Sequence, residues 1–180
     1  YFHLLSHAFF KALLFLGAGS VIHSMSDEQN IKKMGGLYNK IPLTYITMLV
    51  GSFSLMGLPF LSGYYSKDLI LEMIYLNDYN YTFLFFVAGI VSVLFTSIYS
   101  LRLLVYVFHR EIKADEKVLA HVHESPLIMI LPLIVLSIFA IFFGMFANSL
   151  FIDIKYLSIW SDFLYVDESI DSSFITQNVP

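Results

Sequence analysis

Residues 41–76 read IPLTYITMLVGSFSLMGLPFLSGYYSKDLILEMIYL, an apolar run of 36 residues that is charged only in its last third. As one helix it would be about 54 Å long, whereas the hydrocarbon core of a bilayer is about 30 Å thick. Gly57, Pro59 and Gly63 interrupt it, and proline disfavours helix both at its own position and at the residue before it. We therefore predict two half-helices separated by a break near Pro59, the alternative being a continuous helix with a proline kink. Because a break frees backbone polar groups, we expect it to be wet and enclosed by protein.

Three further apolar runs flank this stretch, at residues 1–23, 79–108 and 125–152. Hydrophobic residues make up 58% of the 180 residues and charged residues only 13%, about half the share of a soluble domain. We predict an all-α, polytopic membrane helix bundle with about four transmembrane spans over residues 1–152, followed by an acidic tail at 153–180. The net charge of −4 argues against a nucleic-acid partner, and the lack of cysteine rules out disulfides and thiolate metal sites within this sequence.

The basic residues gather in two loops. Residues 24–40 and 109–124 each carry three of them: Lys32, Lys33, Lys40, Arg110, Lys113 and Lys117. The positive-inside rule directs both loops to the cytoplasm or mitochondrial matrix, and the acidic tail to the opposite side. Because Tyr1 already belongs to an apolar run, we expect the chain to be part of a longer protein.

His3, His7 and Lys11 form a ladder, since steps of four residues keep side chains on one face of a helix. Lys11 lies too deep in its run to reach the interface, so we expect it to be buried in protein or beside water. Imidazole titrates near physiological pH, and we favour a proton relay. The alternatives are a structural ion pair of Lys11 with an absent helix, and a haem or metal site, for which the partner ligands are missing.

Lys67 and Asp68 follow the predicted break directly. We expect Lys67 to lie inside the membrane, in the positive field at the N-terminal end of the second half-helix. Asp68 and Glu72 lie one turn apart and share a helix face. The alternative interpretation is that their side chains extend to the far interface of the membrane.

These motifs occur together in a known family. The stretches HLLSHAFFKALLFLGAGSVIH (residues 3–23), KMGGL (33–37), LPFLSGYYSKD (58–68) and HESP (123–126) resemble the chain 5 family of respiratory NADH:ubiquinone oxidoreductase (complex I), in its mitochondrial form. The resemblance covers about residues 1–150. It implies an antiporter-like membrane-arm subunit, with the four spans corresponding to helices eleven to fourteen and residues 41–76 to the broken helix. It further implies a proton pathway through His3, His7, Lys11, Lys67 and Asp68, with the helix break at Gly57, Pro59 and Gly63.

The resemblance also implies a proton-translocating role in respiratory electron transport, as a translocase subunit in the mitochondrial inner membrane with the tail on the intermembrane side. This chain itself would bind no cofactor or metal and hold no catalytic residue or redox centre, while the assembled complex would use NADH, FMN, iron–sulfur clusters and ubiquinone. Its partners would be other membrane-arm subunits, the missing N-terminal part of the same subunit, and lipids. Whether the chain is a split-gene product or an incomplete subunit stays open.

Two rival functions remain. One is a subunit of a multi-subunit Mrp-type cation/proton antiporter, which co-purification with flavin and iron–sulfur subunits would exclude. The other is a structural scaffold without a proton path, against which the presence of His7, Lys11 and Lys67 argues.

Overall fold

The structure is a computed structural model that describes residues 1–76, 80–114 and 116–152. Its α-helices are α1 (Phe2–Ser24), α2 (Pro42–Met56), α3 (Ser62–Tyr75), α4 (Thr82–Leu104), α5 (Glu116–His121) and α6 (Leu127–Ile152). Two short 3-10 helices, Ile31–Lys33 and Leu37–Asn39, lie in the first loop, and a π-helical turn, Val105–His109, continues α4. The described residues contain no β-strand, and the all-α prediction is confirmed. The predicted acidic tail, residues 153–180, lies outside the described residues.

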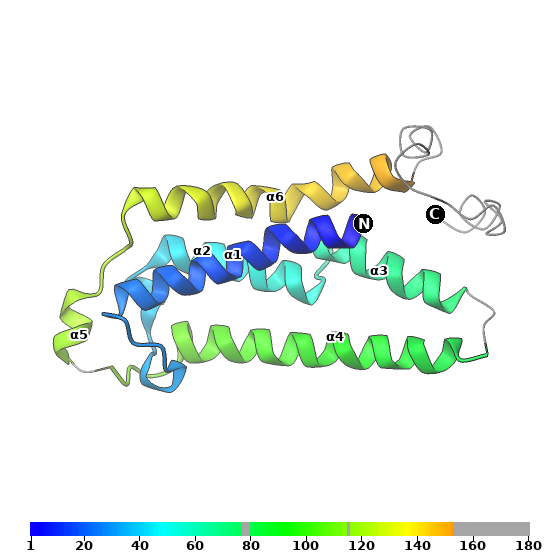
Figure 1. Cartoon of the computed structure of the whole chain (residues 1–180). Helices are drawn as coiled ribbons and strands as arrows, with labels where there is room; N and C mark the ends of the chain where they lie inside the picture. Colours follow the sequence, from blue (N-terminus) through cyan, green and yellow to red (C-terminus); the bar gives the residue numbers. More distant parts are fainter. Residues whose placement is uncertain (77–79, 115, 153–180) are drawn as a thin grey trace.

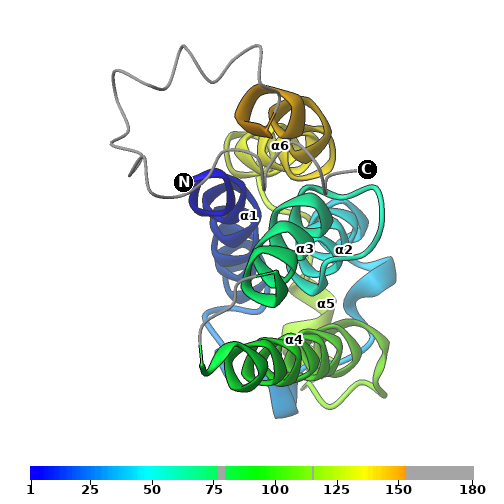
Figure 2. The ribbon, with the colours of Figure 1, turned by 90° about the vertical axis from the view of Figure 1, so that its right-hand side faces the viewer.

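The long helices run side by side (Figure 1). Seen along the bundle, α6 lies on one side, α1 lies beside α2 and α3 in the middle, and α4 lies on the other side (Figure 2). Phe2–Ser24, Thr82–His109 and Leu127–Asn148 are each long and apolar enough to cross a membrane. The shorter α2 and α3, of 15 and 14 residues, follow one another in the middle layer at the place of the remaining predicted span, and α2 is a shorter apolar helix. The prediction of about four spans is confirmed.

The second span is broken rather than kinked. Helix α2 ends at Met56, and Gly57 adopts a left-handed conformation with φ of 84°. The Leu58 N–H donates to the Phe53 carbonyl at 3.1 Å and the Gly57 N–H to the Ser54 carbonyl at 3.1 Å. This pair of bonds is the Schellman arrangement that ends a helix and pairs two of its last carbonyl groups.

Gly63, which we grouped with the break, lies instead in the first turn of α3. A Cβ atom there would overlap the Ser54 carbonyl group. Its function is therefore close packing between the two half-helices, while Gly57 and Pro59 end α2 and start the connection.

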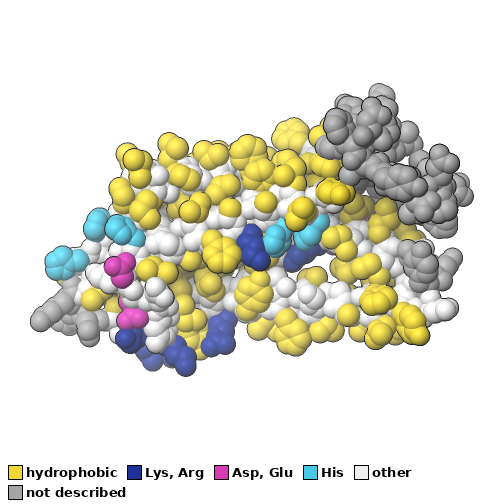
Figure 3. Space-filling model, in the orientation of Figure 1, with side chains coloured by type: hydrophobic (Ala, Val, Ile, Leu, Met, Phe, Trp, Pro, Cys, Tyr) yellow, Lys and Arg dark blue, Asp and Glu magenta, His cyan; other side chains and the backbone are white. Residues whose placement is uncertain are grey.

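Hydrophobic side chains cover the outer surfaces of α4 and α6, as Figure 3 shows. The charged side chains gather mainly at the end of the bundle that carries the loops, and a second group of Lys and His side chains lies over the middle of α1. The loop end is held by a buried apolar cluster of Val21, Met25, Met34, Leu37, Ile41, Met48, Leu104, Val107, Phe108 and Val122. The polar group at mid-length therefore stands out against an apolar bundle.

Candidate functional site

Two residues of the ladder on α1 face a groove between α1, α2 and α4. The His3 and His7 rings lie 5.6 Å apart between centroids. His7 and Lys11 both line the groove, which has a volume of about 370 Å³ and also carries Ser52 and Ser100. Lys11 is exposed within this chain rather than buried, so it lies beside an open groove. The predicted common face of the three residues agrees with this geometry.

His3 connects this ladder to the second half-helix. Its Nδ1 atom lies 3.0 Å from the hydroxyl oxygen of Ser66, which is fully buried on α3. The Ser66 hydroxyl in turn lies 3.4 Å from the Gly63 carbonyl oxygen in the first turn of α3. A chain of polar groups thus runs from α1 to the helix break. Sequence reasoning missed the contact of Ser66 with His3, because the two residues lie 63 positions apart in the chain.

Lys67 bridges the two half-helices. Its ammonium group donates a hydrogen bond to the carbonyl of Leu55, in the last turn of α2. The carbonyls of a last turn have no partner within their own helix and carry the negative end of the helix dipole. The expectation that Lys67 lies in the positive field at the start of α3 was wrong, because its long side chain reaches back across the break.

Two serine hydroxyl groups, those of Ser54 and Ser62, lie at the break. The Ser54 hydroxyl accepts a hydrogen bond from the Gly63 N–H at 3.2 Å and lies 3.3 Å from the Ala140 carbonyl of α6. The Ser62 hydroxyl is fully buried and has no protein partner within the described residues. A buried hydroxyl without a partner is a position for an ordered water. The break therefore pairs its freed backbone groups inside protein and offers a site for water.

Asp68 points away from this polar chain. Its side chain is exposed on α3, beside the Tyr64 hydroxyl, and the described residues give it no ion pair with Lys67. Glu72, one turn further on, is half-buried. The structure thus brings together His3, His7, Ser66 and the break with Lys67, and it separates Asp68 from them.

A second polar cluster lies at the loop end of α2 and was not anticipated. The Glu124 carboxylate accepts hydrogen bonds from the N–H groups of Leu43 and Thr44 at 2.9 and 3.2 Å, and from the Thr44 hydroxyl at 2.5 Å. The buried Ser20 hydroxyl lies 3.0 Å from that of Thr44 and 2.7 Å from that of Ser125. Glu124 therefore caps the N-terminus of α2 from a distance of 80 residues along the chain, which no local pattern reveals.

These residues do not fit a metal or iron–sulfur site. The described part of the chain brings no three His, Cys, Asp or Glu side chains together as metal ligands, and the sequence has no cysteine for a cluster. The arrangement of imidazole, hydroxyl and amine groups is suited to passing protons along hydrogen bonds.

Comparisons with known proteins agree with the motifs. The family model described as NADH:quinone oxidoreductase/Mrp antiporter, TM, matches residues 1–96. Three similar curated proteins, each named NADH-ubiquinone oxidoreductase chain 5, come from Dictyostelium citrinum, Marchantia polymorpha and Triticum aestivum. They are 48%, 49% and 53% identical over 89%, 92% and 84% of this chain, and the matches cover 24%, 24% and 22% of their own lengths. The chain thus spans about a quarter of the length of these relatives.

Proposed function

The chain belongs to the NADH:quinone oxidoreductase/Mrp antiporter transmembrane family, and from this premise we propose that it forms part of the proton-translocating membrane arm of NADH:ubiquinone oxidoreductase. Every curated relative described above bears the name of chain 5 of that enzyme. We further propose the mitochondrial inner membrane as its location, since the sequences of its motifs resemble those of the mitochondrial forms of the family. The apolar outer surface of α4 and α6 supports a place in a membrane.

The proposed proton path runs from the groove at His7 through His3 and Ser66 to the helix break at Lys67. The observation that carries it is the contact of 3.0 Å between His3 Nδ1 and Ser66 Oγ, which joins the ladder of α1 to the broken span. The two imidazole rings are 5.6 Å apart, a separation that one bridging water can serve. Lys11 lines the groove beside His7 and would hold or receive the proton at its entrance.

Lys67 is the proposed switch of this path. While it is protonated, its bond to the Leu55 carbonyl ties α2 to α3. A neutral amine is a weaker donor than an ammonium group, so loss of the proton would loosen this tie and admit water at the break. Asp68, exposed on the following position, is proposed as the residue that exchanges protons with the far side.

We propose that NADH, FMN, the iron–sulfur clusters and ubiquinone bind to other subunits of the complex. For the iron–sulfur clusters this is supported by the absence of cysteine from the sequence. The partners of this chain would be other membrane-arm subunits, the remaining three quarters of the same subunit, and lipids. An Mrp-type antiporter is the second candidate, because the matching family description includes it.

The experiment that tests the proposal replaces His3 by leucine in the assembled complex and measures membrane potential against NADH oxidation. Because the variant cannot bond to Ser66, we expect NADH oxidation to support a markedly smaller potential. His23→Leu is the matched control, since His23 is exposed at the loop end of α1. A full potential in an assembled His3→Leu complex would reject the path. Recovery of the chain without flavin and iron–sulfur subunits would instead favour the Mrp-type antiporter.

A further inference from the structure

The loop end of α4 carries a pair of arginines stacked on one tyrosine. Arg102, Tyr106 and Arg110 follow one another at intervals of four residues. The guanidinium carbons of Arg102 and Arg110 lie 5.4 and 4.8 Å from the centroid of the Tyr106 ring, within the range of cation–π attraction. None of the three residues takes part in the proposed proton path.

The π-helical turn Val105–His109 explains how both arginines reach the same ring. In an α-helix, a step of four residues overshoots a full turn by about 40°, so two such steps would turn Arg110 by about 80° relative to Arg102. A π-helical turn holds more residues than an α-helical one, and its step of four falls short of a full turn. The two offsets oppose each other and keep both guanidinium groups on the tyrosine.

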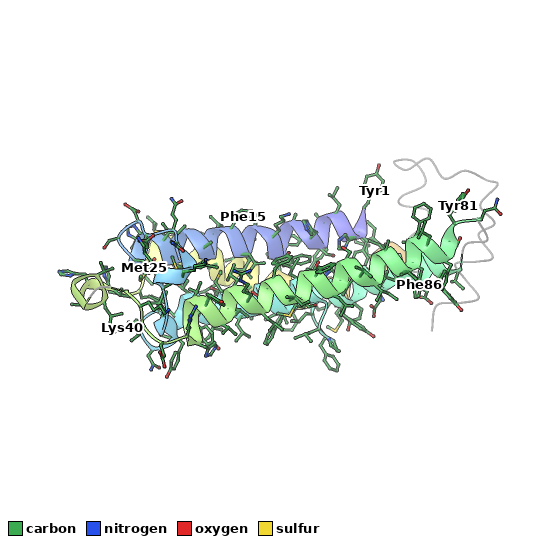
Figure 4. The ribbon with its side chains drawn as sticks, turned by 90° about the horizontal axis from the view of Figure 1, so that it is seen from below. Tyr1, Phe15, Met25, Lys40, Tyr81 and Phe86 are labelled. Carbon is green, nitrogen blue, oxygen red and sulfur yellow. The ribbon has the colours of Figure 1, made fainter. Side chains whose placement is uncertain are left out.

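The height of this stack in a membrane follows from the helix length. The candidate span Thr82–His109 has 28 residues and is about 42 Å long, roughly 12 Å more than the hydrocarbon core. The other end of the helix is aromatic and uncharged, with Tyr81 and Phe86 there and Lys40 at the arginine end in Figure 4. The excess of about 12 Å equals the rise of eight residues, which is the interval from Arg102 to Arg110. If the aromatic end of the helix lies at one interface and the helix stands upright, the stack lies in the headgroup layer on the side of the basic loops.

Within the described part of the chain, the two positive charges have no carboxylate partner. Arg102 is exposed and Arg110 half-buried, and the described residues give neither an ion pair with a carboxylate. Both charges lie within 5.4 Å of one ring, so they repel each other unless an anion lies between or above them. Ile98 and Leu101 of α4 and Val105 of the π-helical turn, which lie within four residues of Arg102 along the chain, have exposed apolar side chains.

We propose that Arg102, Tyr106 and Arg110 bind the phosphate group of an anionic phospholipid. The fork-shaped guanidinium groups suit the phosphate oxygens, and the apolar residues on the membrane side suit the acyl chains. The position in the headgroup layer selects a lipid over a soluble phosphate. Basic residues at this side of a membrane are a recurrent lipid-binding feature.

The test uses the assembled complex in phosphatidylcholine bilayers that contain either a photoactivatable phosphatidylglycerol or, at the same mole fraction, a photoactivatable phosphatidylcholine. The lipid attached to peptides covering residues 102–110 is quantified by mass spectrometry. We expect phosphatidylglycerol to label these peptides several-fold more than phosphatidylcholine. Arg102→Gln and Arg110→Gln should each reduce labelling by phosphatidylglycerol about fivefold, and Tyr106→Leu should reduce it while Tyr106→Phe retains it.

The matched control is Lys32→Gln with Lys113→Gln, which removes two exposed charges from the same side and should leave labelling unchanged. Equal labelling of the unaltered complex by the two lipids would overturn the proposal, even if no arginine variant assembled. Labelling by phosphatidylglycerol that Arg102→Gln and Arg110→Gln leave unchanged in assembled complexes would overturn it too.

Discussion

At the scale of single residues, Lys67 is the side chain on which most of the site depends. It is half-buried and pairs the Leu55 carbonyl across the helix break. In the assembled complex we expect Lys67→Ala to abolish most proton pumping, because it removes the exchangeable proton and leaves a buried carbonyl unpaired, at a cost of about 1–3 kcal/mol. Membrane potential per NADH oxidised is the measurement, with native gels to verify assembly.

The Lys67→Arg variant distinguishes loss of the exchangeable proton from loss of the hydrogen bond to Leu55. Arginine can still donate to Leu55 but keeps its proton at all accessible pH values. We therefore expect it to restore assembly and stability while leaving pumping impaired. The exposed Lys32→Ala is the control for loss of one positive charge. Normal pumping in an assembled Lys67→Ala complex would remove Lys67 from the path.

Glu28, in the first loop, should make that loop sensitive to acid. Its carboxylate accepts a hydrogen bond from the Lys33 ammonium at 2.9 Å and from the Asn30 N–H at 3.0 Å. The bond from Lys33 is the main cause that lowers the pKa of Glu28 below its ordinary value of 4.5. A lowered pKa in the folded state means that the bonds stabilise the loop above 4.5 and are lost as the pH falls through the lowered pKa.

Hydrogen exchange of the Asn30 amide measures this effect, once corrected for the intrinsic pH dependence of exchange. We expect protection to decrease in acid below pH 4.5, and to be low at all pH values in Glu28→Gln. An acid-independent protection of Asn30 would contradict the assignment.

At the scale of elements, the break between α2 and α3 depends on two glycines for different reasons. Gly57 has φ of 84°, where alanine costs about 1–2 kcal/mol. Gly63 has ordinary helical geometry, but an added Cβ would overlap the backbone of Ser54. We expect Gly63→Ala to destabilise the complex more than Gly57→Ala, because a backbone overlap forces the half-helices apart. Gly19→Ala is the control, since its Cβ would meet nothing within 4 Å.

The yield and thermal stability of the assembled complex rank the three variants. Equal stability of Gly63→Ala and Gly19→Ala would show that the half-helices do not pack as closely as the structure has them.

The elements also show what the sequence could and could not predict. The spans and the break near Pro59 follow from local quantities, namely run length, apolar composition and the backbone preferences of glycine and proline. The contacts of His3 with Ser66, Lys67 with Leu55 and Glu124 with Leu43 join positions 12 to 81 residues apart. Their geometry depends on helix packing, which a sequence pattern does not contain. For the same reason, the expectation that Lys67 lies in the positive field of α3 was wrong, since its ammonium group contacts the last turn of α2.

At the scale of the whole molecule, α2 links the two polar regions. Glu124 lies at its N-terminus and Lys67 at its C-terminus, so a negative and a positive side chain match the two ends of its dipole. The helix is 15 residues long, about 22 Å. The buried hydroxyl cluster of Ser20, Thr44 and Ser125 ties the same end of α2 to α1 and to the start of α6.

Because side chains bind both ends of α2, we expect the two ends to act together. In the assembled complex, Glu124→Gln should reduce proton pumping, because the N-terminus of α2 loses an anion worth about 0.3–2 kcal/mol. If α2 is held as one rigid unit, the effects of Glu124→Gln and Lys67→Arg will not add, with a coupling of about 0.5 kcal/mol or more.

Pumping rates of the two single variants and the double variant give this coupling energy directly. Glu28→Gln combined with Lys67→Arg is the control cycle, since Glu28 bonds within its own loop and should contribute independently. Independent effects of Glu124 and Lys67 would mean that each end of α2 adjusts by itself. The loop side of the bundle would then have no mechanical route through α2 to the helix break.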